Sequence, residues 1–98
     1  MRLERDSLAF RVYEQREIEE EFFCNYELNP SFQAALQDAG LRITGRGERG
    51  EARIVELPGH RFFLASLFLP QLSSTKERPH PLITKYLEAA LKFRARRV

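Results

Sequence analysis

Few side chains in this 98-residue chain could do proton, thiol or metal chemistry. The sequence has one cysteine, Cys24, and two histidines, His60 and His80. A metal site would need further ligands at suitable spacing, and none accompanies the histidines, so we expect both to be structural. Cys24 has aromatic and polar neighbours and no adjacent lysine, which favours a half-buried structural cysteine over a reactive thiol.

The segment from Leu57 to Leu72 carries the strongest indication of a former active site. Its apolar residues predict a strand that runs into a turn at Pro70, where a sheet could present side chains to a cleft. The two positions at that turn that could do proton chemistry hold Leu69 and Gln71. Leucine cannot accept a proton, and an amide cannot orient a base by charge as a carboxylate does. The segment therefore has the outline of a catalytic strand without catalytic groups.

Composition restricts the class of protein. A chain of this length makes one small domain, residues 1–98, or part of a larger one. The net charge of +2 is too small to argue for a nucleic-acid partner, and no apolar run approaches the roughly 20 residues of a membrane span. A single cysteine rules out an internal disulfide and fits a reducing compartment. We expect a cytoplasmic protein, with the acidic stretch at 17–21 and the basic stretch at 92–97 both solvated.

Hydrophobic patterning predicts an α/β fold with a mixed, mostly antiparallel sheet of about five strands and two helices. One helix should begin at Asn29 as N-cap and end at Gly40 as C-cap, and the second should begin near Pro79. The predicted strands cover residues 8–13, 18–28, 41–45, 52–57 and 62–69, the last buried on both faces.

Several motifs in this order indicate a family. They are Asn25-Tyr26-Glu27-Leu28-Asn29, Asp38-Ala39-Gly40-Leu41-Arg42, Val55-Glu56-Leu57-Pro58-Gly59-His60 followed by Phe62-Phe63, and Pro79-His80-Pro81-Leu82. From about Leu8 to Phe93 the chain resembles the C-terminal half of the class I glutamine amidotransferase domain of CTP synthases. The resemblance implies a partial amidotransferase-like fold. In that family, the domain's activity would be glutamine hydrolysis for CTP synthesis, within pyrimidine biosynthesis.

The chain departs from that family at the residues that carry the chemistry. Where the family has a His-Pro-Glu base and orienter, this sequence reads Leu69, Pro70 and Gln71. Where the family has a His-Arg-Tyr substrate clamp, the sequence reads Cys24, Asn25 and Tyr26, and an asparagine cannot form the bidentate pair of a guanidinium. The family's nucleophile sits on a Gly-x-Cys-x-Gly elbow upstream of the matching region. We therefore expect no glutaminase activity from the isolated chain.

Three functions stay open on the sequence. The first is a pseudoenzyme with a binding or assembly role, whose degenerate pocket at Cys24, Asn25, Tyr26 and Gln71 could hold a small amide or amino acid. The second is a subunit or fragment that completes an active amidotransferase with a second polypeptide. The third is a redox protein based on Cys24. We expect no cofactor and no metal. A homo-oligomer or a second chain would cover a sheet face left open.

Overall fold

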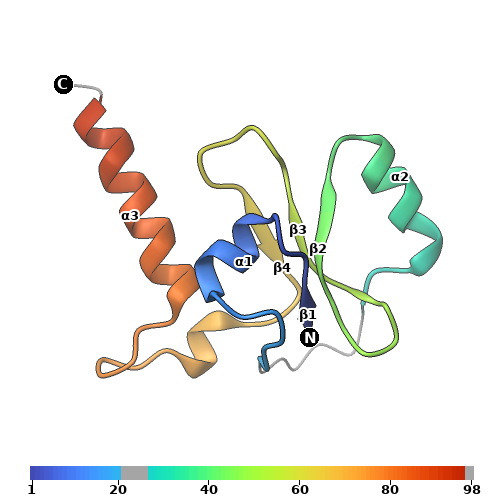
Figure 1. The fold of residues 1–98 in the computed structure, drawn as a ribbon, viewed down its shortest axis with the longest axis horizontal. Helices are drawn as coiled ribbons and strands as arrows, with labels where there is room; N and C mark the ends of the chain where they lie inside the picture. Colours follow the sequence, from blue (N-terminus) through green and yellow to red (C-terminus); the bar gives the residue numbers. More distant parts are fainter. Residues whose placement is uncertain (21–26, 97–98) are drawn as a thin grey trace.

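The computed structural model describes residues 1–20 and 27–96. This part of the chain folds as a four-stranded antiparallel sheet with three α-helices (Figure 1). The strands are β1 (Arg2–Leu3), β2 (Arg42–Arg46), β3 (Ala52–Glu56) and β4 (Leu64–Ser66). The helices are α1 (Leu8–Tyr13), α2 (Gln33–Asp38) and α3 (Pro81–Arg96), with short 3-10 helices η1 (Pro30–Phe32) and η2 (Pro70–Ser73). The predicted mixed α/β class is confirmed, with one strand fewer and one helix more than expected.

The strands lie in the sheet in their chain order, β1-β2-β3-β4, although α1, η1 and α2 intervene between β1 and β2. β2 pairs with β3 with Ile43 opposite Val55, and the register shifts around Gly45. A side chain at Gly45 could not be accommodated, because a Cβ there would lie 2.9 Å from the Ile54 side chain. The predicted strands at 41–45 and 52–57 are confirmed, because β2 and β3 match them to within one residue at each end.

The prediction of a strand at 8–13 was wrong, because these residues form helix α1. The hydroxyl of Ser7 caps the helix by accepting from the Phe10 amide, at 3.0 Å. The buried carboxylate of Glu56 accepts from the amides of Leu8 and Ala9, at 2.9 and 2.8 Å. Ordering of α1 thus depends on a residue 47 or 48 positions away, which no local pattern reveals.

The first predicted helix is confirmed, and it begins with a 3-10 turn. The Asn29 side chain accepts from the Ser31 amide, and Pro30 occupies the first turn of η1. After α2, Gly40 takes φ +99°, which is the left-handed conformation expected of a glycine after a helix. Of the predicted strand at 18–28, residues 18–20 and 27–28 are not in a strand, and 21–26 lie outside the described residues.

The predicted long strand at 62–69 was wrong in length and in burial. Only Leu64–Ser66 forms a strand, Ala65 is exposed, and Phe63 keeps 43% of its surface accessible. Among the described strands, β4 pairs only with β3 and lies at the edge of the sheet. The exposure of Phe63 and Ala65 shows that the segment is not buried on both faces, as its apolar sequence suggested.

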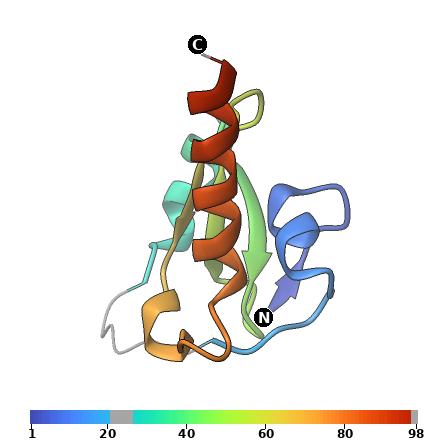
Figure 2. The ribbon, with the colours of Figure 1, turned by 90° about the vertical axis from the view of Figure 1, so that its left-hand side faces the viewer.

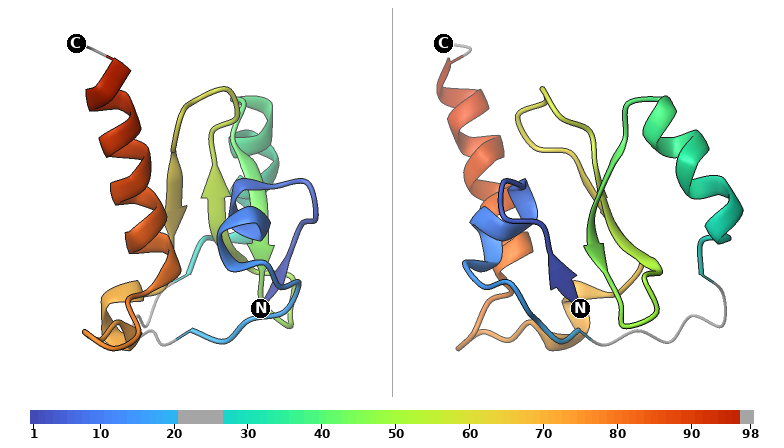
Figure 3. Two further views of the ribbon diagram at one scale, coloured as in Figure 1. Left: turned by 60° about the vertical axis from the view of Figure 1, so that its left-hand side comes forward. Right: turned by 45° about the vertical axis from the view of Figure 1, so that its right-hand side comes forward.

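Helices α1 and α2 lie on opposite sides of the sheet, and α3 stands beside its β4 edge (Figures 2 and 3). The predicted final helix is confirmed. The helix is buried only at its start, because Leu82 is buried whereas Tyr86 is 56% exposed. The core lies between the sheet, α1 and the beginning of α3, and consists of Leu3, Ala9, Val12, Ile18, Ile54, Phe68 and Leu82.

Candidate functional site

The turn after β4 holds the two positions that the sequence singled out. Phe68 is buried in the core, and the chain then enters η2 with Leu69 as its N-cap residue and Pro70 at its first position. The Leu69 carbonyl accepts from the Leu72 amide at 3.0 Å, which closes the turn. Gln71 lies on the exposed side of η2, and Leu69 is half-buried. Neither side chain can serve as a general base.

The other predicted pocket residues, Cys24, Asn25 and Tyr26, lie outside the described residues. The flanking residues on both sides are described. Glu20 lies beside η2, and Glu27 lies at the β2–β3 hairpin, where its carboxylate contacts Arg49 and Arg53. The structure therefore fixes the two ends of the segment that would carry the degenerate pocket.

A buried polar cluster adjoins η2, and sequence reasoning did not find it. The Glu20 carboxylate accepts from the Tyr13 hydroxyl and contacts His80 Nε2, both at 2.5 Å, and its second oxygen lies 3.3 Å from the Ser73 hydroxyl. The Glu20 and His80 side chains are each only 3% exposed. The expectation that the whole acidic stretch at 17–21 is solvated was therefore wrong for Glu20. The adjacent charges of that stretch gave no sign that one carboxylate has a buried partner.

The contacts of His80 define the protonation of its ring. Its Nδ1 accepts from the Leu82 amide at 3.0 Å, so Nδ1 carries no proton and Nε2 donates to Glu20. His80 thereby caps the N-terminus of α3 with its own side chain, while Pro81 takes the first helical position. Both ring nitrogens are occupied by partners inside the protein.

This cluster is suited to hold structure rather than to transfer protons. Burial, followed by the hydrogen bond and negative charge of Glu20, raises the pKa of Tyr13 far above its ordinary value, so the phenol stays protonated and donates. The Glu20 carboxylate joins the chain after α1 to η2 and to the start of α3. His80 has no free lone pair for a substrate proton, because both ring nitrogens have partners inside the protein.

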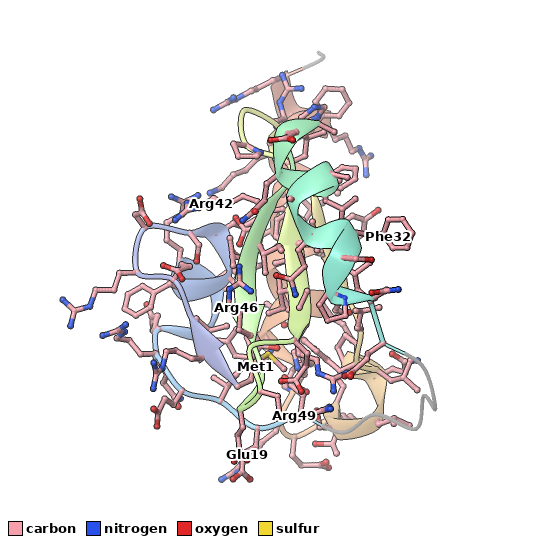
Figure 4. All side chains as sticks on the ribbon, turned by 90° about the vertical axis from the view of Figure 1, so that its right-hand side faces the viewer. Met1, Glu19, Phe32, Arg42, Arg46 and Arg49 are labelled. Carbon is pink, nitrogen blue, oxygen red and sulfur yellow. The ribbon has the colours of Figure 1, made fainter. Side chains whose placement is uncertain are left out.

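A second charged cluster lies at the end of the β2–β3 hairpin. Arg49 contacts Glu27 and Glu51 at 3.0 and 2.9 Å, and Arg53 contacts Glu27 at 3.3 Å. Burial disfavours the charge of Glu51, but the Arg49 amide and the charges of Arg49 and Arg53 outweigh it and lower the pKa of Glu51. Figure 4 shows Arg49 at this end of the molecule, near Met1 and Glu19.

One face of the sheet loses its cover toward β4. The paired residues Ile43, Val55 and Ala65 form a row across β2, β3 and β4, and their burial falls from buried to half-buried to exposed. Phe63 stands one residue before β4 on the same face, because side chains alternate along a strand. We call the surface formed by the half-buried Val55 and the exposed Phe63 and Ala65 the open face.

Two classes of site are not represented in the part of the chain that the structure describes. Residues 1–20 and 27–96 hold no group of three or more His, Cys, Asp or Glu side chains placed to bind a metal ion. Within the same residues, no helix has the length and apolar character needed to cross a lipid bilayer.

The chain matches known proteins in sequence. No protein-family model matches it. A CTP synthase from Syntrophus aciditrophicus is 42% identical over 97 residues, which cover 98% of this chain and 18% of that protein. A CTP synthase from Chlamydia muridarum is 41% identical over 88 residues, which cover 89% of this chain and 16% of that protein. The chain thus spans less than one fifth of the length of these relatives.

The fold also matches a solved structure. The glutaminase domain of the Trypanosoma brucei CTPS with bound acivicin superposes with a TM-score of 0.84 at 31% sequence identity. The match covers 92% of this chain and 36% of that one.

Proposed function

Because the chain is related to CTP synthase and has the fold of part of its glutaminase domain, we propose that it is an amidotransferase-like pseudoenzyme with a binding or assembly role. The observation that supports the proposal is that Leu69 and Gln71 flank Pro70 at the turn after β4, where the resemblance implies the base and the orienter of the family. A side chain without a basic atom cannot take the proton of a nucleophile, and an uncharged amide cannot stabilise an imidazolium.

The surroundings of the turn support this proposal. His80 is the described histidine closest in sequence to η2, and both of its ring nitrogens are bound within the protein. A substitute base would have to come from another residue or another chain. The resemblance also places Asn25 where the family has its substrate-binding arginine, which removes the charge that would hold the α-carboxylate of glutamine.

An assembly role is supported by apolar surface on two elements. The open face exposes Phe63 and Ala65, and the outer side of α3 exposes Leu87 and Leu91, the latter at 62%. Exposed apolar residues grouped on one face of a small protein indicate an interaction site. The occupant that we propose is a polypeptide carrying further strands of a glutaminase-type sheet, because β4 is the edge strand of the sheet in the part of the chain that the structure describes.

The first experiment tests the loss of catalysis. Purified chain is incubated with glutamine, and released ammonia is measured by a coupled assay. We expect no release above the buffer rate. The double variant Leu69→His with Gln71→Glu should stay inactive by itself, since a base and an orienter need a nucleophile to act on. Ammonia release that saturates with glutamine in the unmodified chain would refute the pseudoenzyme proposal.

A second candidate function is the completion of an active amidotransferase with another polypeptide. The TM-score of 0.84 to a glutaminase domain favours it, because the backbone of part of such a domain is retained. Co-purification with a polypeptide that carries the remaining strands and a cysteine elbow tests it. Ammonia release that requires both chains would support this function, and a stable but inactive complex would support the assembly role alone.

Two finer proposals concern ligand and redox chemistry. A small amide or amino acid in a remodelled pocket should cause saturable NMR shifts at the η2 residues when glutamine or asparagine is added.

A redox role of Cys24 requires a thiol that reacts faster than a free peptide cysteine at neutral pH. A labelling rate equal to that of the peptide would exclude the redox role.

The single cysteine fits a reducing compartment, for which we propose the cytoplasm.

A further inference from the structure

A groove of about 500 Å³ runs between α1, α3 and the loop before β4, apart from the turn at η2. Five basic residues line it: Arg11, Arg61, Lys85, Lys92 and Arg96. They come from three separate elements, which the fold brings to the two walls of one groove. Lys92 and Arg96 are exposed, as the sequence predicts for the terminal basic residues, and they line this groove. We call it the basic groove.

The basic groove carries an excess of positive charge. Its one acidic residue, Glu88, is paired with Lys85 at 3.2 Å, so the two charges offset each other. Among residues 1–20 and 27–96, no carboxylate forms a salt bridge with Arg11, Lys92 or Arg96. Three cations on both walls thus face the groove without a neutralising partner in the described structure.

The rest of the groove lining is apolar. Val12, Phe62, Ala89 and Phe93 contribute to it from the same three elements. The lining on α3 extends from Lys85 to Arg96, which at a rise of about 1.5 Å per residue is roughly 16 Å. A bound helix of about three turns would match this length, as would an extended strand with fewer residues.

We propose that the basic groove binds an acidic amphipathic segment of a partner protein. Apolar side chains of that segment would contact Phe62, Ala89 and Phe93, and its carboxylates would pair with Arg11, Lys92 and Arg96. Burial of apolar surface supplies the attraction, and the opposite charges on the walls set the orientation and the partner choice.

The aromatic residues argue against nucleic acid as the occupant. Binding of single strands depends on free aromatic faces on which bases stack. Here the Arg61 guanidinium lies 4.5 Å from the centre of the Phe93 ring, over one face. The Phe62 ring is engaged edge to face with Tyr86, at 5.8 Å between centroids. The Phe62 and Phe93 rings are therefore better placed for apolar contacts than for stacking with bases.

The test uses the 98-residue chain and a fluorescein-labelled peptide of about 14 residues, long enough for three helical turns. Leucines lie on one helical face and glutamates on the rest, and fluorescence anisotropy reports binding. The groove variant combines Arg11→Gln, Lys92→Gln and Arg96→Gln. The matched control combines Arg5→Gln, Lys76→Gln and Arg94→Gln, which removes the same charge from residues that do not line the groove. Circular dichroism verifies that both fold.

We expect the groove variant to weaken binding about tenfold and the control less than twofold, since three exposed ion pairs together contribute an effect of that order. In the unmodified chain, NMR shift changes should fall on α1, α3 and the loop before β4. Equal weakening in both variants would mean general charge attraction and overturn the proposal. So would equal binding of a peptide with shuffled leucines, tighter binding of an oligothymidylate, or no peptide binding at millimolar concentration.

Discussion

The two faces of the β3–β4 part of the sheet are made of alternate residues of the same strands, yet only one of them is sealed. On the α1 side, Ile54 has no accessible surface and lies in the core with Ala9. On the opposite side, Val55 is half-buried and Ala65 is exposed. Neighbouring residues of similar apolar character therefore differ in burial, because among residues 1–20 and 27–96 the covering helix α1 lies on one side of this part of the sheet.

Hydrogen bonds to Glu56 explain how α1 is held against the sheet. Helix α1 is six residues long, too short to be stable alone, and the Glu56 carboxylate fixes its first turn to β3. On the other side, α2 packs beside β2 and does not extend over β4 (Figure 3). The comparison indicates that the described part of the chain buries the sheet under α1 and leaves the open face more accessible.

The largest expected effect comes from truncating neighbouring residues on the two faces. Ile54→Ala should lower the free energy of unfolding by about 2–5 kcal/mol, because it leaves a cavity between the sheet and α1. Val55→Ala should cost less than about 1.5 kcal/mol, since its site is partly open already. Guanidinium titrations with matched slopes measure both. Equal losses would show that the open face is as tightly packed as the core.

The second prediction concerns the contact between Glu56 and α1. Glu56→Ala should reduce stability by about 2–3 kcal/mol, because two helix amides lose a charged acceptor in a buried place. Glu56→Gln retains one acceptor and should lose about half as much. Hydrogen exchange should show faster exchange of the Leu8 and Ala9 amides in both variants. Unchanged protection of these amides would argue against the capping role.

The third prediction is a pH dependence at the charged hairpin end. The folded pKa of Glu51 is lowered, so its contribution to stability is present above the unfolded value of about 4.3 and is lost as the pH falls through the folded pKa. The protein should thus be more stable than Glu51→Gln at pH 7. The difference should shrink below about pH 4. Thermal unfolding of both proteins across this range measures the effect, and a constant difference would contradict it.

The smallest expected effect on folding is also the sharpest test of the open face. Ala65→Lys places a charge on an exposed edge-strand position and should change stability by less than about 0.5 kcal/mol. It should nevertheless abolish association with a partner that packs on this face. Analytical ultracentrifugation measures the association of the unmodified chain and of the variant, each alone and mixed with the candidate partner. A loss of several kcal/mol in stability would mean that Ala65 already packs against the chain itself.

Much of the fold could be predicted from local signals. The caps at Asn29 and Gly40, strands β2 and β3 and the start of α3 follow from residues within a few positions of each boundary. The segment at 8–13 could not be assigned, because its alternation suits a strand and its helix depends on Glu56 far along the chain. The same holds for Glu20, whose burial depends on His80, 60 residues away.

The sequence by itself determined which side chains stand at the turn after β4. Leu69 and Gln71 have no basic or charged atom, and that follows from residue type without any coordinates. Only the tertiary structure decided which apolar and charged residues are covered, because burial depends on elements distant along the chain. Helix α1 seals one face of the sheet through Glu56, the opposite face at Phe63 and Ala65 stays open, and α3 brings Lys92 and Arg96 to the same groove as Arg11.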